Sequence, residues 1–147
     1  MKTQSKKIKC PIELVLAIVG DKWKIMIVRE LFVSVRRFNE LLKNLAPISQ
    51  KMLTQQLRAL EEDGIITRTV YNQIPPKVEY FLTERGRSLA PLMKALGEWG
   101  YDNYKNYLDK YDINIDRNGT TAFFIHLERV KNSLIGIPEN IIHKPII

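Results

Sequence analysis

The stretch SQKMLTQQLRALEEDG, residues 49–64, has the pattern of one short helix with a start signal and a stop signal. Ser49 can accept a hydrogen bond from a free amide of the first turn, and Gly64 can adopt the left-handed conformation that ends a helix. At about 100° per residue the apolar positions lie within a narrow arc. These positions are Leu53, Leu57 and Leu60. The stretch therefore predicts an amphipathic helix with one core-facing side.

The opposite side of this helix is rich in hydrogen-bonding and cationic groups, carried by Lys51, Thr54, Gln55 and Arg58. Every acid of the stretch lies in its last turn, at positions 61–63, where negative charge opposes the helix dipole. A solvated outer face would explain the polarity. An anionic partner that approaches the N-terminal half would explain, in addition, why the acids lie only at the far end.

The composition is that of one globular domain with its own core, because 45% of the 147 residues are hydrophobic and 27% are charged. The formal net charge of +7 favours nucleic acid, an anionic membrane surface or an acidic protein as partner. No signal peptide or membrane-spanning run is found, so we expect a cytoplasmic protein without membrane association. A single cysteine excludes an intrachain disulfide, and neither His126 nor His143 has a ligating neighbour, so no metal site and no cofactor are expected.

Two helices are predicted in the first third of the chain. A basic tail, residues 1–9, leads to Pro11, which is a favourable first helical residue. The helix that it begins, over 11–20, is mostly apolar, and we expect it to be buried. Asp21 can cap a second core helix over 22–33.

A short helix and a hairpin flank the stretch of residues 49–64. The helix, over 38–45, is joined to that stretch by a tight turn, which is the pattern of a helix-turn-helix. After it the hydrophobic period changes to two, and the segment NQIPP can form a turn between two strands. A hairpin directly after a recognition helix is a wing, where Arg68 and Lys77 could lie near phosphates on either side.

A long helix is predicted after the hairpin, with Thr83 as its cap and an irregular first turn or kink at Pro91, which cannot donate a backbone hydrogen bond. Its apolar stripe is formed by Leu89, Leu92, Leu96, Trp99 and Tyr107. The stripe is too long for the core that remains, so a partner subunit is the expected cover, and packing on its own domain is the alternative.

The chain resembles the HxlR family of bacterial and archaeal winged helix-turn-helix transcription regulators. The resemblance covers about residues 9–106 and rests on CPIELVLAIVGDKWKIMIVREL, RRFNEL, ISQKMLTQQLRALEEDGII and Y(x)3PPKVEYFLTERGRSLAPLMKALGEWG in combination. It implies a mainly α fold with a small β-hairpin, a winged helix-turn-helix whose N- and C-terminal helices dimerise. Where relatives often have Gly and Pro before RRF, this chain has Ser34 and Val35, so the local turn differs.

The resemblance also implies how the protein binds double-stranded DNA. As a homodimer it would place two recognition helices in successive major grooves of a pseudo-palindromic operator, with the hairpin around 72–77 as the wing. The recognition positions are Ser49, which caps the helix, and Gln50, Lys51, Thr54, Gln55 and Arg58, which face the groove. Gln55 and Arg58 are long enough to reach base edges, whereas Lys51 and Thr54 can hold phosphates. The expected phosphate neutralisers are Lys22, Arg36, Arg37, Arg68 and Lys77, each of which is otherwise a solvated surface charge.

Cys10 has two interpretations. It precedes Pro11 at a helix N-terminus and follows three lysines, so nearby positive charge should favour the thiolate. Some members of the resembled family use a cysteine near this point to sense quinones, electrophiles or disulfide stress, which implies an oxidant or small-molecule effector. Otherwise it is a small buried hydrophobic residue.

The predicted function is therefore sequence-specific, DNA-binding transcription regulation by residues 10–108. The first alternative is a nonspecific nucleic-acid-binding architectural protein, although its recognition face should be dominated by Lys rather than by mixed groups. The second is a winged helix that makes only protein contacts. Enzyme activity is not expected, because no nucleophile-elbow, phosphate-loop or metal motif occurs. Residues 109–147 form a C-terminal extension of unknown role, in which TTAFFIHLERVKNSLIG could be one more amphipathic helix.

Overall fold

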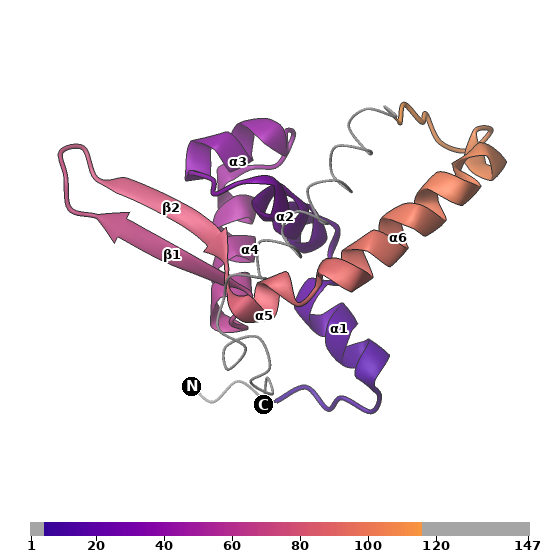
Figure 1. Ribbon diagram of the computed structural model, residues 1–147, viewed down its shortest axis with the longest axis horizontal. Coiled ribbons are helices and arrows are strands. Elements are labelled where there is room, and N and C mark those ends of the chain that lie inside the picture. Colours follow the sequence, from indigo (N-terminus) through magenta and orange to yellow (C-terminus); the bar gives the residue numbers. More distant parts are fainter. Residues whose placement is uncertain (1–4, 116–147) are drawn as a thin grey trace, which may run out of the picture.

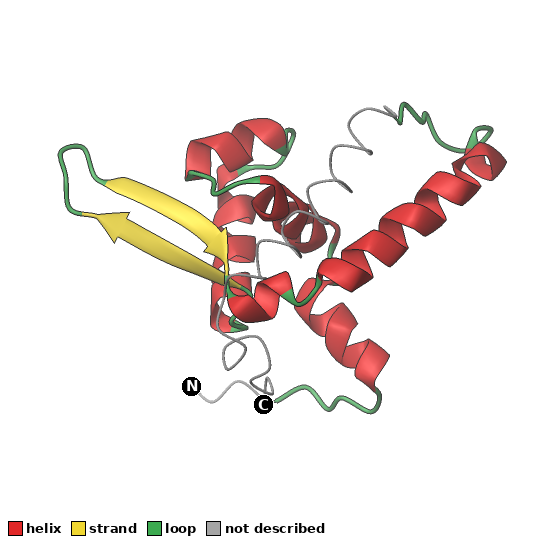
Figure 2. Ribbon diagram, viewed as in Figure 1, coloured by secondary structure: helices red, strands yellow, loops and turns green. Residues whose placement is uncertain are grey.

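The computed structural model describes residues 5–115. Its elements are α1 (Pro11–Val19), α2 (Lys22–Val33), α3 (Phe38–Asn44), α4 (Gln50–Glu62), β1 (Ile66–Tyr71), β2 (Lys77–Leu82), α5 (Glu84–Arg87), α6 (Ala90–Asn103) and a 3-10 turn, η1 (Tyr104–Tyr107). Figure 1 shows α2, α3 and α4 gathered in the centre, with the hairpin projecting to the left and α1 and α6 to the right. The described part is thus mainly α with one small β-hairpin, as the secondary-structure colours of Figure 2 make plain.

The core lies between α2, α3, α4 and the base of the hairpin. The predicted leucine stripe of α4 is confirmed, because Leu53, Leu57 and Leu60 are each at most 2% exposed. They pack with further apolar side chains that are also buried, among them Ile27, Val28, Leu31 and Phe32 of α2 and Leu41 of α3. Burial of each such side chain contributes about 1.5–3 kcal/mol, so this stripe fixes how α4 sits on the domain.

Both predicted ends of α4 are confirmed. The Ser49 hydroxyl accepts a hydrogen bond from the Met52 amide at 3.1 Å, and Gly64 has the left-handed φ of 73°. Asp21 caps α2 in the same way, because its Oδ1 accepts from the Trp23 amide at 2.7 Å. Since these caps act within a few residues, the sequence alone predicts where the helices begin and end.

The hairpin is a two-stranded sheet that one further residue, Arg36, joins by an isolated bridge. Its two strands are antiparallel and pair Ile66 with Leu82, Arg68 with Tyr80 and Val70 with Val78. The chain before α3 pairs with β2 at one position, because the Arg36 amide donates to the Tyr80 carbonyl at 3.0 Å and the Tyr80 amide donates to the Arg36 carbonyl at 2.8 Å. Paired residues share one face, so Arg36, Tyr80 and Arg68 lie side by side on the same face of the sheet.

The predicted irregular start of the last helix is confirmed. α5 ends at Arg87, and α6 begins only at Ala90, next to Pro91. The Thr83 hydroxyl accepts from the Gly86 amide at 3.0 Å, which caps α5 as expected. The prediction that Tyr107 continues the same α-helix is wrong, because α6 ends at Asn103 and residues up to 107 form the 3-10 turn.

The prediction that the first helix is buried is also wrong. Ile12 and Leu16 of α1 are 71% and 60% exposed, and Val19 in the last turn is the one buried residue of the helix. Figure 1 shows the reason: α1 projects away from the central helices and approaches α2 only at its C-terminal end. The helix predicted within residues 116–147 lies outside the described residues. Among residues 5–115, no helix is both long enough and apolar enough to cross a membrane.

Candidate DNA-binding interface

The outer face of α4 presents three long polar side chains to solvent. Lys51, Gln55 and Arg58 are exposed, and neither cation forms an ion pair with another described residue. They occur at spacings of four and three residues, so they follow one another along a single side of the helix. With 13 residues α4 is about 19 Å long, and a helix of about 10–12 Å diameter fits the major groove of B-DNA.

The other predicted recognition residues occupy the edges of this face. Gln50 is exposed at the first turn, whereas Ser49 is engaged as the cap. Thr54 is half-buried, and its hydroxyl donates to the Gln50 carbonyl at 2.8 Å. The three acids of the stretch are exposed at the opposite end of α4, beside α5, whose Arg85 donates to the Asp63 carbonyl at 3.4 Å. The cationic half and the acidic end of α4 are thus well separated.

The structure divides the predicted phosphate neutralisers into two groups. Arg37 and Arg68 are exposed and form no ion pair with another described residue. Arg36 and Lys77, by contrast, are already engaged. The Arg36 guanidinium lies 3.5 Å from Glu30 and 3.8 Å from Glu40, and its side chain is 20% exposed.

The ammonium of Lys77 lies 2.6 Å from Glu79 and 5.0 Å from the centre of the Tyr71 ring. In the strand register Lys77 is on the face opposite Arg68, so the two cations project on different sides of the wing, as predicted. An internal carboxylate that neutralises a cation weakens its attraction for an external phosphate. Arg68 is therefore the freer of the two wing cations.

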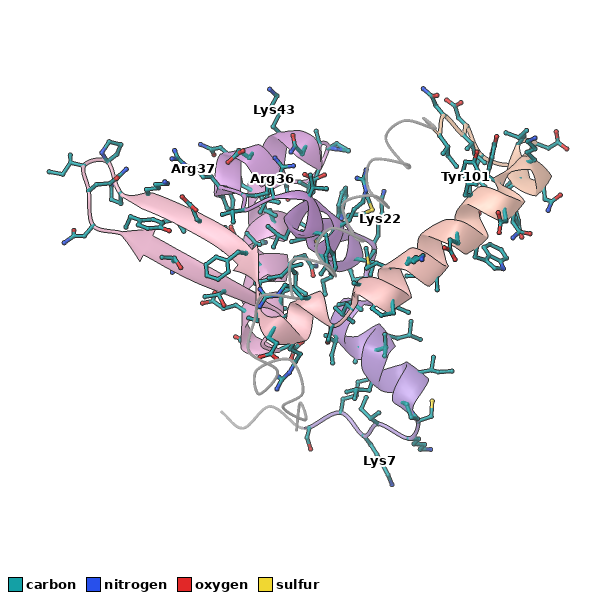
Figure 3. All side chains as sticks on the ribbon, in the orientation of Figure 1. Lys7, Lys22, Arg36, Arg37, Lys43 and Tyr101 are labelled. Atoms are coloured by element: carbon teal, nitrogen blue, oxygen red, sulfur yellow. The ribbon has the colours of Figure 1, made fainter. Side chains whose placement is uncertain are left out.

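The structure does not bring Lys22 together with the other cations. Lys22 begins α2, and its ammonium lies 4.7 Å from the centre of the Trp23 ring. Figure 3 places it toward α6, at the other end of α2 from Arg36 and Arg37. The same view shows Lys43 at the far end of α3 from Arg37, pointing outward from the domain.

Sequence reasoning missed Glu30, a buried acid of α2. Its carboxylate accepts a hydrogen bond from the Asn44 amide group at 3.0 Å and lies next to Arg36. The available signal was an acid on the core side of a predicted amphipathic helix, between Ile27 and Leu31. A charge at such a position requires a partner, and only the folded chain identifies which one.

Cys10 is exposed at the N-terminus of α1, so it is not the small buried hydrophobic residue of the second interpretation. Its sulfur accepts a long hydrogen bond from the Glu13 amide at 3.4 Å, in the position of an N-cap. Within residues 5–115 no group of three potential metal-ligating side chains occurs.

Helices α1 and α6 project on the side of the domain opposite the wing (Figure 1), and several of their apolar side chains are exposed. Leu96 and Trp99 of α6 are 52% and 60% exposed, and Tyr107 is 41% exposed. Leu89 packs partly on the core, and Leu92 is half-buried. The predicted dimerisation residues are thus partly buried at the start of α6 and exposed further along the chain.

The order of elements defines the class of protein. A helix-turn-helix formed by α3 and α4, preceded by α2 and followed by the β1–β2 hairpin, is a winged helix-turn-helix. Residues 18–108 match the HxlR-like helix-turn-helix family, and the chain belongs to that family. It is thus a DNA-binding transcription regulator of the HxlR type.

Similar proteins include regulators with solved structures. The chain is 50% identical over 103 residues to the uncharacterised HTH-type transcriptional regulator YdeP of Bacillus subtilis, over 70% of this chain and 80% of YdeP. It is 49% identical to the redox regulator HypR in its oxidised form, with a TM-score of 0.61 over 64% of this chain and 97% of HypR. The reduced form of the transcriptional regulator YodB from B. subtilis is 34% identical, with a TM-score of 0.59 over 66% of this chain and 95% of YodB.

Proposed function

We propose that the protein binds a pseudo-palindromic DNA operator as a homodimer and reads each half-site with α4. The observation that carries the proposal is the outer face of α4, where Lys51, Gln55 and Arg58 are exposed along one side. A mixture of guanidinium, amide and ammonium groups suits the reading of base edges, which present both donors and acceptors. A face that only held the DNA backbone would need cations alone.

Each side chain of this face has a role that follows from its chemistry. Arg58 donates in a fork that matches the O6 and N7 acceptors of guanine, and Gln55 matches the donor and acceptor of adenine. Lys51, in the first turn, contacts a phosphate together with the free amides of the helix N-terminus. Arg37 and Arg68 contact the DNA backbone on either side of the groove.

The second subunit covers the apolar side chains of α1 and α6. Ile12, Leu16, Leu96 and Trp99 each expose more than half of their surface in the single chain. Exposed apolar side chains on two projecting helices are typical of a subunit interface. A two-fold dimer presents its two recognition helices to half-sites about one helical turn apart, roughly 34–36 Å.

A selection from random DNA tests this proposal. The full chain is incubated with a pool of random duplexes at physiological salt, and bound DNA is amplified and sequenced through several rounds. We expect enrichment of an inverted repeat with half-site centres about 10 base pairs apart. No enriched motif, with binding that random competitor removes, would favour the architectural alternative. Sedimentation at the same concentrations reports the oligomeric state.

We also propose an oxidant response through Cys10. The exposed thiol at the start of α1 lies on one of the two helices assigned to the dimer interface, and HypR is a redox regulator by name. Two Cys10 thiols of a dimer lose two protons and two electrons to an oxidant such as diamide, which becomes a hydrazine, and an intersubunit disulfide forms. On non-reducing gels diamide should give a covalent dimer that Cys10→Ser abolishes. A wild-type chain that stays monomeric on the gel and keeps its operator affinity after diamide would exclude this response.

A further inference from the structure

A carboxylate lies buried where α2, α3 and the wing meet. Among residues 5–115, Glu30 is the one charged residue that is buried, with 8% of its surface exposed. It lies in the third turn of α2 among core residues such as Val28 and Leu31. Burial of a carboxylate is costly unless hydrogen bonds and opposite charges compensate it. The partners of Glu30 therefore matter for the packing around it.

These partners come from different parts of the fold. Oε2 of Glu30 accepts a hydrogen bond from Nδ2 of Asn44 at 3.0 Å and lies 3.5 Å from Nε of Arg36. Oε1 lies 3.6 Å from a guanidinium nitrogen of Arg29 on α2 itself. Asn44 is the last residue of α3, and Arg36 is bridged to Tyr80 in β2 of the wing. One carboxylate thus joins α2, α3 and the wing.

Arg36 is fixed from several directions. Its backbone exchanges two hydrogen bonds with Tyr80, which ties it to β2, and its guanidinium also lies 3.8 Å from Glu40 of α3. Two acids therefore neutralise Arg36, and its buried Nε has no hydrogen-bond partner among the described residues, so Glu30 holds it by charge at 3.5 Å. Although sequence reasoning assigned Arg36 to a phosphate, this geometry gives it an internal role. A continuous set of contacts runs from β2 through Arg36 and Glu30 to the end of α3.

We propose that Glu30 is a positioning residue for DNA binding. Through Arg36 and Asn44 it holds the wing and the helix-turn-helix in the relative orientation that lets both contact one duplex. Apolar packing between α2 and the sheet is non-directional, whereas the hydrogen bond that Asn44 donates to Glu30 has a defined geometry, and the same carboxylate attracts the Arg36 cation. Buried ion pairs often add little net stability, so the role of this one is to orient the wing relative to the helix-turn-helix. The inference rests on the proposed function, since it concerns the binding of an operator.

The direction in which one substitution changes the affinity for DNA distinguishes a positioning role from a purely electrostatic one. Glu30→Gln removes a negative charge, so on charge alone it should strengthen binding to a polyanion. If Glu30 orients the wing, Glu30→Gln should weaken DNA binding instead, because the wing no longer reaches its phosphates when α4 is in the groove. The matched control is Glu61→Gln, which removes an exposed acid of α4 whose carboxylate forms no ion pair or hydrogen bond with another described residue.

The experiment measures affinity for the duplex that the wild-type chain selects from random DNA. We expect Glu30→Gln to weaken binding by about 3- to 30-fold for each subunit of the dimer, the usual range for loss of one coupling contact, while Glu61→Gln binds equally or more tightly. Hydroxyl-radical footprints should lose protection at the flank that the wing contacts and keep it at the centre of each half-site. Circular dichroism at the assay temperature confirms that both variants are folded.

A folded Glu30→Gln chain with unchanged or tighter binding, or with an unchanged footprint, would overturn the inference. If Glu30→Gln does not fold, Asn44→Ala takes its place. Asn44 is exposed, and its substitution removes only the hydrogen bond between α3 and Glu30. This variant should weaken binding in the same direction, and unchanged affinity would again refute a positioning role. Failure of the wild-type chain to select any sequence would refute the proposed function instead, so the two failures are distinguishable.

Discussion

Arg58→Ala is the most direct test of sequence reading by α4. Arg58 is exposed, lies on the side of the helix opposite the leucine stripe, and forms no ion pair with another described residue. Its removal should therefore change the free energy of unfolding by less than about 0.5 kcal/mol. Any loss of DNA binding then reports on the interface and not on folding.

The expected loss follows from the geometry of a two-fold dimer. A bidentate contact between an arginine and guanine contributes about 1–3 kcal/mol of discrimination. Because each half-site contains one Arg58, the dimer should lose about 2–6 kcal/mol on its operator, which is roughly 30-fold to 20,000-fold in affinity. On random DNA no base contact is lost, so binding there should fall only by the loss of charge.

Fluorescence anisotropy with both duplexes, over a series of salt concentrations, measures these quantities. Lys105→Ala is the charge-matched control, since Lys105 is exposed in η1, beyond the end of α6. It should leave both affinities nearly unchanged. Equal losses on operator and random DNA for Arg58→Ala, with a salt slope smaller by about one unit per subunit, would mean that Arg58 contacts a phosphate and does not read a base.

Three further outcomes are expected. Arg68→Ala should reduce the salt slope of operator binding by about one unit per subunit, whereas Lys77→Ala should leave it nearly constant, because an internal carboxylate already neutralises that ammonium; equal slopes for the two variants would contradict this distinction. Gly86→Ala should lower the thermal midpoint, since the added Cβ would lie within 2.2 Å of the Ile65 carbonyl, and an unchanged midpoint in calorimetry would show that α5 can move away. Trp99→Glu should give a folded monomer in sedimentation, because it places a charge on the exposed apolar side of α6; a persistent dimer would assign the interface to another surface.

Local signals in the sequence determined the ends and the inner sides of the helices. The cap at Ser49, the left-handed Gly64 and the break before Pro91 all act within a few residues, and the structure has each of them where the pattern predicts it. The leucines of α4 are likewise buried as their spacing requires. The same holds for the hairpin, whose alternation predicts which residues share a face.

Only the tertiary structure determined which partners the charged side chains have and which apolar side chains are buried. From the sequence Arg36 was expected to neutralise a DNA phosphate or to be a solvated surface charge, but the fold placed it between two acids and against β2. It also left α1 exposed although its composition is that of a core helix. The physical reason is that caps and periodicity depend on neighbours along the chain, whereas ion pairs and burial depend on neighbours in space. The sequence alone therefore predicted the elements, and tertiary packing determined which of their side chains remain free to contact DNA or a second subunit.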